Sequence, residues 1–238
     1  PGVAWLEMAR AAMQAASGEA GGGGQGGQDA PVRLRHVVWS RPLTVAAGPL
    51  RAHLTLRPVA DGSVRCELRS DGPDGPVAHA QCEIEAIASP AEVAPVDLTA
   101  LRERCTRGSW PAADCYTRFA RAGLDYGPAM RALESLHRGD GEVLAQLVLP
   151  AALVAGRAAY AMHPSLLDAA LQSLIGLADE AADASLAWLP YALDEIEWRL
   201  PFTDRLWAHA RTVSGAAADS RLRRYDIDVF DDAGRLCA

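Results

Sequence analysis

The chain has 238 residues, half of them hydrophobic, and a formal net charge of −7 at pH 7. This length allows one large domain or two small ones, with enough apolar residues for a sizeable core. All 23 basic residues are arginine and they form no dense run, so the composition argues against a nucleic-acid-binding protein.

The first half of the sequence predicts one helix followed by an antiparallel sheet. Residues 3–16 carry apolar side chains at helical spacing, and the glycine-dominated residues 17–28 predict a loop. Runs with strand character follow, separated by turn residues typical of hairpins. These runs are residues 33–40, 51–58, 64–70 and 77–87.

The second half predicts the same plan again. A short helix at 111–122 comes first, and an almost wholly apolar helix lies at 164–178. The predicted strands are residues 130–138, 142–149, 187–199, 204–213 and 222–230. The sequence thus predicts an N-terminal domain (1–88), an inter-domain linker (89–110) with prolines and mixed polarity, and a C-terminal domain (111–238).

This organisation predicts an α+β fold with two tandem repeats, each an antiparallel sheet curled around a central helix. Two such repeats in one chain form a double hotdog. The sequence starts directly in a helical pattern, and the turn residues 231–234 imply a returning strand. We therefore expect the first strands of the N-terminal domain and the last strand of the C-terminal domain to lie outside these residues.

Cysteine usage and hydropathy predict a soluble cytoplasmic protein. The five cysteines form no CxxC pair, and an odd number fits no closed disulfide framework. The sequence shows no signal peptide and no stretch of about 18 apolar residues that would suit a membrane helix. No metal site is predicted either.

The helix that follows His163 carries the strongest functional signal. Pro164 suits the first helical position, where its missing N–H costs nothing. Asp168 and Gln172 stand four residues apart, so they share one helix face and can hydrogen-bond. A buried carboxylate must be paired, hydrogen-bonded or protonated, and a carboxylic acid that stays neutral near pH 7 can act as a general acid. Spacing alone leaves catalysis and a structural role for Asp168 equally open.

Four segments, in order along the chain, resemble motifs of the dehydratase domain of modular polyketide synthases. Residues 1–12 resemble the end of its HxxxGxxxxP motif and the helix after it. Residues 126–130 (YGPAM) resemble its YGPxF segment, with methionine in place of the usual aromatic residue. Residues 163–172 match HPxxxDxxxQ, and residues 189–193 (LPYAL) resemble its LPF segment. The resemblance covers nearly the whole chain, and four ordered segments are more specific than any one of them.

The resemblance implies dehydration of a 3-hydroxyacyl chain held as a thioester on an acyl carrier protein. The substrate would be attached to the carrier's phosphopantetheine, and the domain would need no cofactor. In the family, the aspartate matched by Asp168 is the acid, and Gln172 would orient it. The base is the histidine that opens HxxxGxxxxP, which we expect upstream of Pro1. The remaining histidines lie in no such motif and are assigned to strands or the surface: His36, His53, His79, His137 and His209.

By the same resemblance, further residues would bind the substrate. They are Tyr126, Gly127, Pro128, His163, Leu189 and Pro190. Structural alternatives stay open: a loop turn before a strand for residues 126–128, a cap of the following helix for His163, and a core role for Pro190.

The implied partners are the acyl carrier protein and the neighbouring polyketide synthase domains, and a homodimer is possible. Arginines within residues 102–107 and at 223–224 could meet an acidic carrier, although scattered arginines usually form a solvated face. Within the same fold, the alternative functions are a double-bond isomerase, an oxygen-ring-forming cyclase and a non-catalytic scaffold. Retention of Asp168 and Gln172 favours dehydration, because protonation of a leaving hydroxyl needs an acid.

Overall fold

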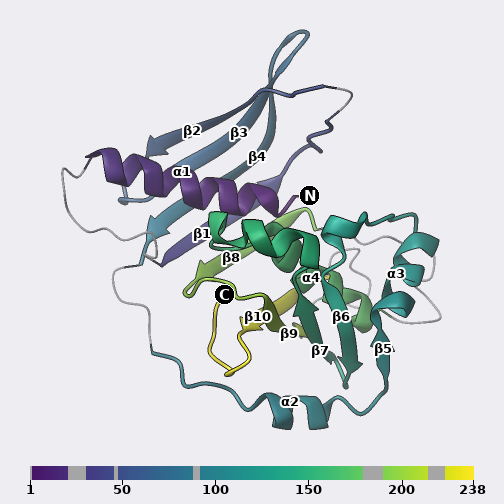
Figure 1. Cartoon of the computed structure of the whole chain (residues 1–238). Helices are drawn as coiled ribbons and strands as arrows, with labels where there is room; N and C mark the ends of the chain where they lie inside the picture. Colours follow the sequence, from purple (N-terminus) through teal and green to yellow (C-terminus); the bar gives the residue numbers. More distant parts are fainter. Residues whose placement is uncertain (1, 21–30, 46–47, 88–91, 179–189, 214–222) are drawn as a thin grey trace. The chain divides into compact units, whose positions relative to one another are not determined.

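The computed structural model describes residues 2–20, 31–45, 48–87, 92–178, 190–213 and 223–238. The chain forms two compact units, each of which contains one five-stranded antiparallel sheet (Figure 1). One helix lies against the first sheet and several lie against the second in the described residues. The first unit combines Pro1–Ala91 with Leu189–Leu200, and the second combines Glu92–Trp188 with Pro201–Ala238.

In the first unit, the helix α1 (Ala4–Ala20) lies across β2, β3 and β4, as Figure 1 shows. In spatial order the strands of its sheet are β2 (Ala52–Pro58), β3 (Val64–Gly72), β4 (Gly75–Ala86), β1 (Val32–Trp39) and β8 (Ala192–Trp198). The core of the unit includes Leu6 and Ala9 on the helix and Leu34 and Ile84 in the sheet, all of them buried. The helix and the four strands predicted in the first half of the sequence therefore form, with small shifts of their ends.

The strand β8 departs from the sequence-based prediction, which placed residues 187–199 in the C-terminal domain. It instead pairs antiparallel with β1, with Leu34 opposite Ile196. Alternating polarity specifies a strand and its buried face, but it does not specify the neighbouring strand. Trp198 is fully buried in the first unit, so pairing with β1 removes a large apolar side chain from water.

The second unit is built around α4 (Pro164–Gln172). In spatial order its strands are β10 (Tyr225–Phe230), β9 (Arg205–Thr212), β7 (Glu142–Val148), β6 (Leu133–Arg138) and β5 (Ser109–Pro111). The predicted helix 164–178 is α-helical up to Gln172 and continues as the 3-10 helix η3 (Ser173–Leu177), which packs on β6, β7 and β9. Gly176 allows this close approach, because a Cβ atom there would lie 2.6 Å from Leu136 and 2.8 Å from Val143.

The remaining helices of the second unit are α2 (Leu98–Arg104), α3 (Ala112–Arg121), η1 (Pro128–Met130) and η2 (Ala151–Ala159). The helix α2 lies in the segment that the sequence predicts as a linker. Asp97 caps it by accepting the N–H groups of residues 99 and 100. Leu101 and Cys105 then pack on Leu144 and Phe230 of the second sheet. The prolines of this segment precede the helix, and its short apolar pattern is too weak a signal to reveal that it covers a sheet.

The five cysteines are buried thiols without disulfide bonds. Across the described parts of the chain, the helices lack the length and apolar character that a membrane crossing requires.

Candidate active site

The helix α4 begins at Pro164, and His163 occupies its cap position. The His163 ring accepts the N–H of Ser165 at Nδ1, with an N–N distance of 3.2 Å. The side chain of His163 is buried, and its ring meets that of Tyr160 edge to face, with centroids 4.8 Å apart. The structure thus gives His163 a capping role, while contact with substrate stays a prediction.

Asp168 and Gln172 lie one turn apart on α4 and are hydrogen-bonded. Gln172 Nε2 donates to Asp168 Oδ2 at 2.7 Å and to the Met130 carbonyl oxygen at 3.0 Å. Gln172 is buried and Asp168 is half-buried. Burial raises the pKa of Asp168, and the hydrogen bond from Gln172 partly opposes this rise. Asp168 therefore holds its proton to a higher pH than an exposed aspartate does.

Tyr116 on α3 completes the hydrogen bonding of Gln172 and was not singled out from the sequence. Its hydroxyl donates to Gln172 Oε1 at 3.0 Å and accepts the Leu133 N–H at 3.0 Å. Burial raises the pKa of Tyr116, which keeps its proton in place. In the sequence, Tyr116 stands next to Cys115 and one turn before Phe119, a pattern that indicates an ordinary core face.

The loop at residues 126–130 is attached to α4 at two points. Ser165 Oγ donates to the Ala129 carbonyl oxygen at 2.6 Å, and Gln172 holds the carbonyl of the next residue. Because Ser165 and Gln172 both belong to α4, the YGPAM segment and the helix that carries Asp168 form one local structure.

The predicted substrate-binding residues of this loop differ in burial. Tyr126 is half-buried, and its ring packs edge to face on Phe119 with centroids 5.0 Å apart. Burial, and then the charge of Asp168, raises the pKa of Tyr126 to about 12. Gly127 and Pro128 are exposed, and a Cβ atom on Gly127 would meet nothing within 4 Å. The surface beside this loop is therefore open.

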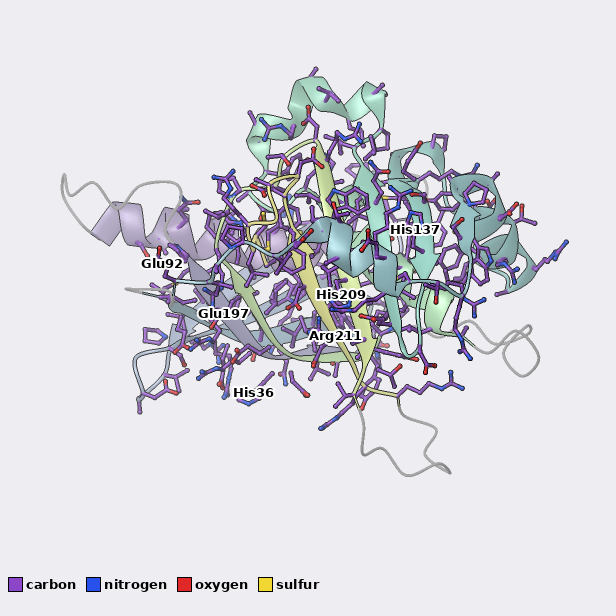
Figure 2. The ribbon with its side chains drawn as sticks, turned by 90° about the horizontal axis from the view of Figure 1, so that it is seen from below. His36, Glu92, His137, Glu197, His209 and Arg211 are labelled. Carbon is purple, nitrogen blue, oxygen red and sulfur yellow. The ribbon has the colours of Figure 1, made fainter. Side chains whose placement is uncertain are left out.

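The other predicted site residues lie elsewhere in the chain. Leu189 is outside the described residues, and Pro190 is exposed and precedes β8 in the first unit. The histidines without a motif all lie on strands: His36 on β1, His53 on β2, His79 on β4, His137 on β6 and His209 on β9. Figure 2 labels three of them, His36, His137 and His209.

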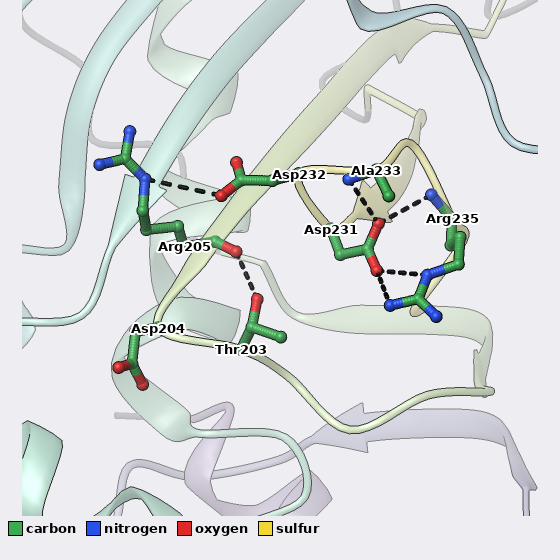
Figure 3. A pocket seen from close by; sticks show the side chains of 7 residues that line it. All are labelled: Thr203, Asp204, Arg205, Asp231, Asp232, Ala233 and Arg235. Carbon is green, nitrogen blue, oxygen red and sulfur yellow. Dashed lines mark hydrogen bonds and ion pairs between the residues drawn. The ribbon is translucent and has the colours of Figure 1, made fainter.

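Asp168 does not line either of two surface hollows that described residues of the second unit form. One of about 390 Å³ lies beside the turn after β10, where Asp231 accepts the N–H groups of Ala233 and Arg235 and the Arg235 guanidinium (Figure 3). These bonds give Asp231 a role in shaping the turn. The other, of about 490 Å³, lies between α3 and β6, and Tyr116 is among its lining residues.

Comparisons with known proteins match both halves of the chain to polyketide synthases. Residues 93–238 match the model of the polyketide synthase dehydratase N-terminal domain, and residues 1–71 match that of the polyketide synthase dehydratase domain. The chain is 32% identical over its whole length to polyketide synthase PksM and 32% identical to PksN, both of Bacillus subtilis. It spans only 6% and 4% of the lengths of those two proteins.

Solved structures show the same fold. A trans-AT polyketide synthase dehydratase domain from Brevibacillus brevis is 34% identical, with a TM-score of 0.88 over 100% of this chain and 81% of that chain. The dehydratase domain from the CurJ module of the Curacin polyketide synthase is 20% identical, with a TM-score of 0.83 over 100% and 79%. These matches confirm the predicted α+β double hotdog fold.

Proposed function

The chain belongs to the polyketide synthase dehydratase domains, and on that premise we propose that it converts a 3-hydroxyacyl thioester into the 2-enoyl thioester. The substrate would be carried on the phosphopantetheine of an acyl carrier protein, and the domain would use no cofactor. Because the chain spans about 6% of its curated relative PksM, we propose neighbouring polyketide synthase domains as its partners.

The observation that supports this proposal is the hydrogen-bonded pair of Asp168 and Gln172 on the largely buried helix α4. A base removes the proton from C2 of the substrate while Asp168 gives its proton to the hydroxyl on C3. The C–O bond breaks, water leaves, and the C2–C3 double bond forms. A positioned acid and a positioned base each contribute roughly 10²–10⁴-fold to such a reaction.

The base in this proposal is a histidine upstream of Pro1, as the resemblance to the family implies. Tyr126, Gly127 and Pro128 are proposed to line the substrate site, and their attachment to α4 through Ser165 supports this role. The proposed substrate contacts of His163, Leu189 and Pro190 rest on the resemblance alone.

The decisive experiment is Asp168→Asn in the full-length polypeptide that contains these residues, assayed with a 3-hydroxyacyl pantetheine thioester. Asparagine keeps the shape of the side chain but has no acidic proton, so we expect kcat to fall by roughly 10²–10⁴-fold. Asp226→Asn, an exposed change on β10, is the matched control and should leave kcat unchanged. Dehydration by Asp168→Asn at nearly the normal rate would show that Asp168 is not the acid.

The products distinguish the alternative functions. A shifted double bond would indicate an isomerase, and a cyclic ether from a substrate with a distal hydroxyl would indicate a ring-forming cyclase. The residue that occupies the first position of the HxxxGxxxxP motif is a further discriminator. A histidine there supports the dehydratase, whereas another residue favours a scaffold or an isomerase.

A further inference from the structure

We infer that Tyr116 is a positioning residue for the acid: through Gln172, it holds Asp168 so that the transferable proton sits on Oδ1. This inference rests on the proposed dehydration and deepens it, because it names the oxygen that would protonate the leaving hydroxyl. It follows from which groups at the site can only donate and which can only accept hydrogen bonds.

The hydrogen bond from Leu133 fixes which way the Tyr116 hydroxyl donates. Its backbone N–H can only donate, and it lies 3.0 Å from the Tyr116 oxygen, which must therefore accept. The hydroxyl has one proton, and its other partner is Gln172 Oε1 at 3.0 Å. The Tyr116 proton consequently points at the carbonyl end of the Gln172 amide.

The second fixed direction comes from Met130. Its backbone carbonyl can only accept, so the atom of Gln172 that lies 3.0 Å away must be the amide nitrogen. The other proton of that nitrogen is donated to Asp168 Oδ2 at 2.7 Å. Three partners, from α3, η1 and α4, thus fix the plane of the Gln172 amide, and rotation of this buried amide would cost hydrogen bonds.

The third step concerns the two oxygens of Asp168. An unprotonated carboxyl oxygen is a better acceptor than a hydroxyl oxygen, so the N–H of Gln172 favours the acid form with its proton on Oδ1. Burial of Asp168, which raises its pKa, increases the share of this form at neutral pH. In the proposed reaction, the leaving hydroxyl therefore takes its proton from Oδ1, while Oδ2 stays bound to Gln172.

The hydroxyl of Tyr116 can be tested separately from its ring. The ring packs on Phe119 and Tyr126, with centroids 6.1 and 6.0 Å away, and the Arg131 guanidinium lies 5.3 Å from its centre. Phenylalanine preserves these contacts, so Tyr116→Phe removes the two hydrogen bonds of the oxygen and little else.

The experiment is a double-mutant cycle of Tyr116→Phe and Gln172→Leu in the full-length polypeptide, assayed with the 3-hydroxyacyl pantetheine thioester. Loss of the anchor lets the amide and the acid move, so we expect Tyr116→Phe to lower kcat about tenfold with KM changed less than about twofold. In the Gln172→Leu background, the same change should have no further effect on kcat. Tyr225→Phe, which removes a hydroxyl from β10 in the same unit, is the matched control and should keep full kcat.

Normal kcat in Tyr116→Phe, or an equal fall in both backgrounds, would overturn the inference. Thermal unfolding of the same four proteins provides a readout that does not depend on turnover: the decrease in melting temperature caused by Tyr116→Phe should be smaller when Gln172 is leucine. Additive decreases would contradict action through Gln172. Absence of dehydration in the unmutated protein would instead overturn the proposed function, and the melting temperatures would still decide whether the two residues are coupled.

Discussion

The helices α1 and α4 each lie against a five-stranded sheet, but Glu7 of α1 and Asp168 of α4 have different partners. Glu7 on α1 is buried with Arg10, whose guanidinium binds both carboxylate oxygens at 2.8 Å and lies 5.1 Å from the Trp198 ring. Asp168 on α4 is bound by the neutral amide of Gln172. The partner therefore decides what the carboxylate does: a guanidinium makes it half of a structural ion pair, whereas an amide leaves it able to exchange a proton.

The largest effect on stability is expected from Arg10→Met, because this change removes the guanidinium that binds both carboxylate oxygens of the buried Glu7. Removal of one partner of a buried ion pair costs about 3–5 kcal/mol, whereas replacement of both partners by apolar residues is often nearly neutral. Urea denaturation followed by tryptophan fluorescence should therefore show a large loss for Arg10→Met. The double variant with Glu7→Leu should recover most of it.

The same measurement on Asp168→Asn tests whether the carboxylate of Asp168 differs in role from that of Glu7. A raised pKa means that Asp168 favours folding at pH values below its ordinary pKa of 3.8, and that this contribution is lost as the pH rises through the folded-state pKa. At pH 7, asparagine should therefore leave the free energy of unfolding unchanged or slightly higher. A loss as large as that of Arg10→Met would show that the carboxylate of Asp168 is structural too.

The outer faces of the two sheets also differ. On the face of β1 opposite to buried Leu34, Arg33 pairs with Glu85 and Glu197, so that face is covered by ion pairs. The outer face of the second sheet is instead covered by α2 and contains a chain of polar contacts, in which His209 contacts both Glu142 and Arg211. Figure 2 labels His209 and Arg211. Apolar side chains of α2 thus pack on the outer face of the second sheet, whereas the outer face of the first sheet carries ion pairs.

Acid should weaken the second unit through Glu142. Hydrogen bonding from Arg104, and then from His209, lowers the pKa of Glu142 from 4.5 to about 2. The stability that it contributes is full above pH 4.5 and is lost as the pH falls through 2. Unfolding measured from pH 5 to pH 2 should show this loss, and Glu142→Gln should remove most of it. The exposed change Glu134→Gln, by contrast, should preserve it.

A smaller effect on stability is expected from Gly234→Ala, which tests the packing of the segment before α2 on the second unit. Gly234 has a φ of +76° and a Cβ atom there would lie 2.1 Å from the Val96 carbonyl oxygen. Val96 also donates its N–H to the Gly234 oxygen at 2.9 Å, so the substitution separates the segment before α2 from the turn. We expect a loss of about 2 kcal/mol, measured as a lower melting temperature.

Gly62→Ala is the matched control for this test. Its φ is +89° and nothing lies within 4 Å of the added Cβ atom, so it carries only the backbone cost. Equal losses of stability from the two glycine substitutions would mean that the segment around Val96 moves without an energetic cost. That segment would then not hold α2 against the second sheet.

Local features of the chain were predictable from the sequence. Pro164 marks the start of α4, and the four-residue spacing of Asp168 and Gln172 predicts that they meet, as they do at 2.7 Å. Both inferences need only helix geometry. The two-sheet plan was predictable for a similar reason, since alternating polarity and turn residues act over a few positions.

Features that depend on distant residues were not predictable in the same way. Tyr116 lies 56 positions from Gln172, and nothing in its own neighbourhood distinguishes it from a core tyrosine. The partner of β8 and the sheet face under α2 are likewise set by packing between segments far apart in sequence. Hydrophobic periodicity does not encode such choices.

The pairing of β8 with β1 has a practical consequence for the transfer of the first unit between related domains. The first unit comprises two stretches of chain, Pro1–Ala91 and Leu189–Leu200, so no single junction can transplant it. A truncated 1–91 would expose the bare edge of β1, whose unpaired peptide groups invite aggregation, and a 92–238 fragment would bring Trp198 into water. A chimeric enzyme should therefore inherit both stretches from the same parent.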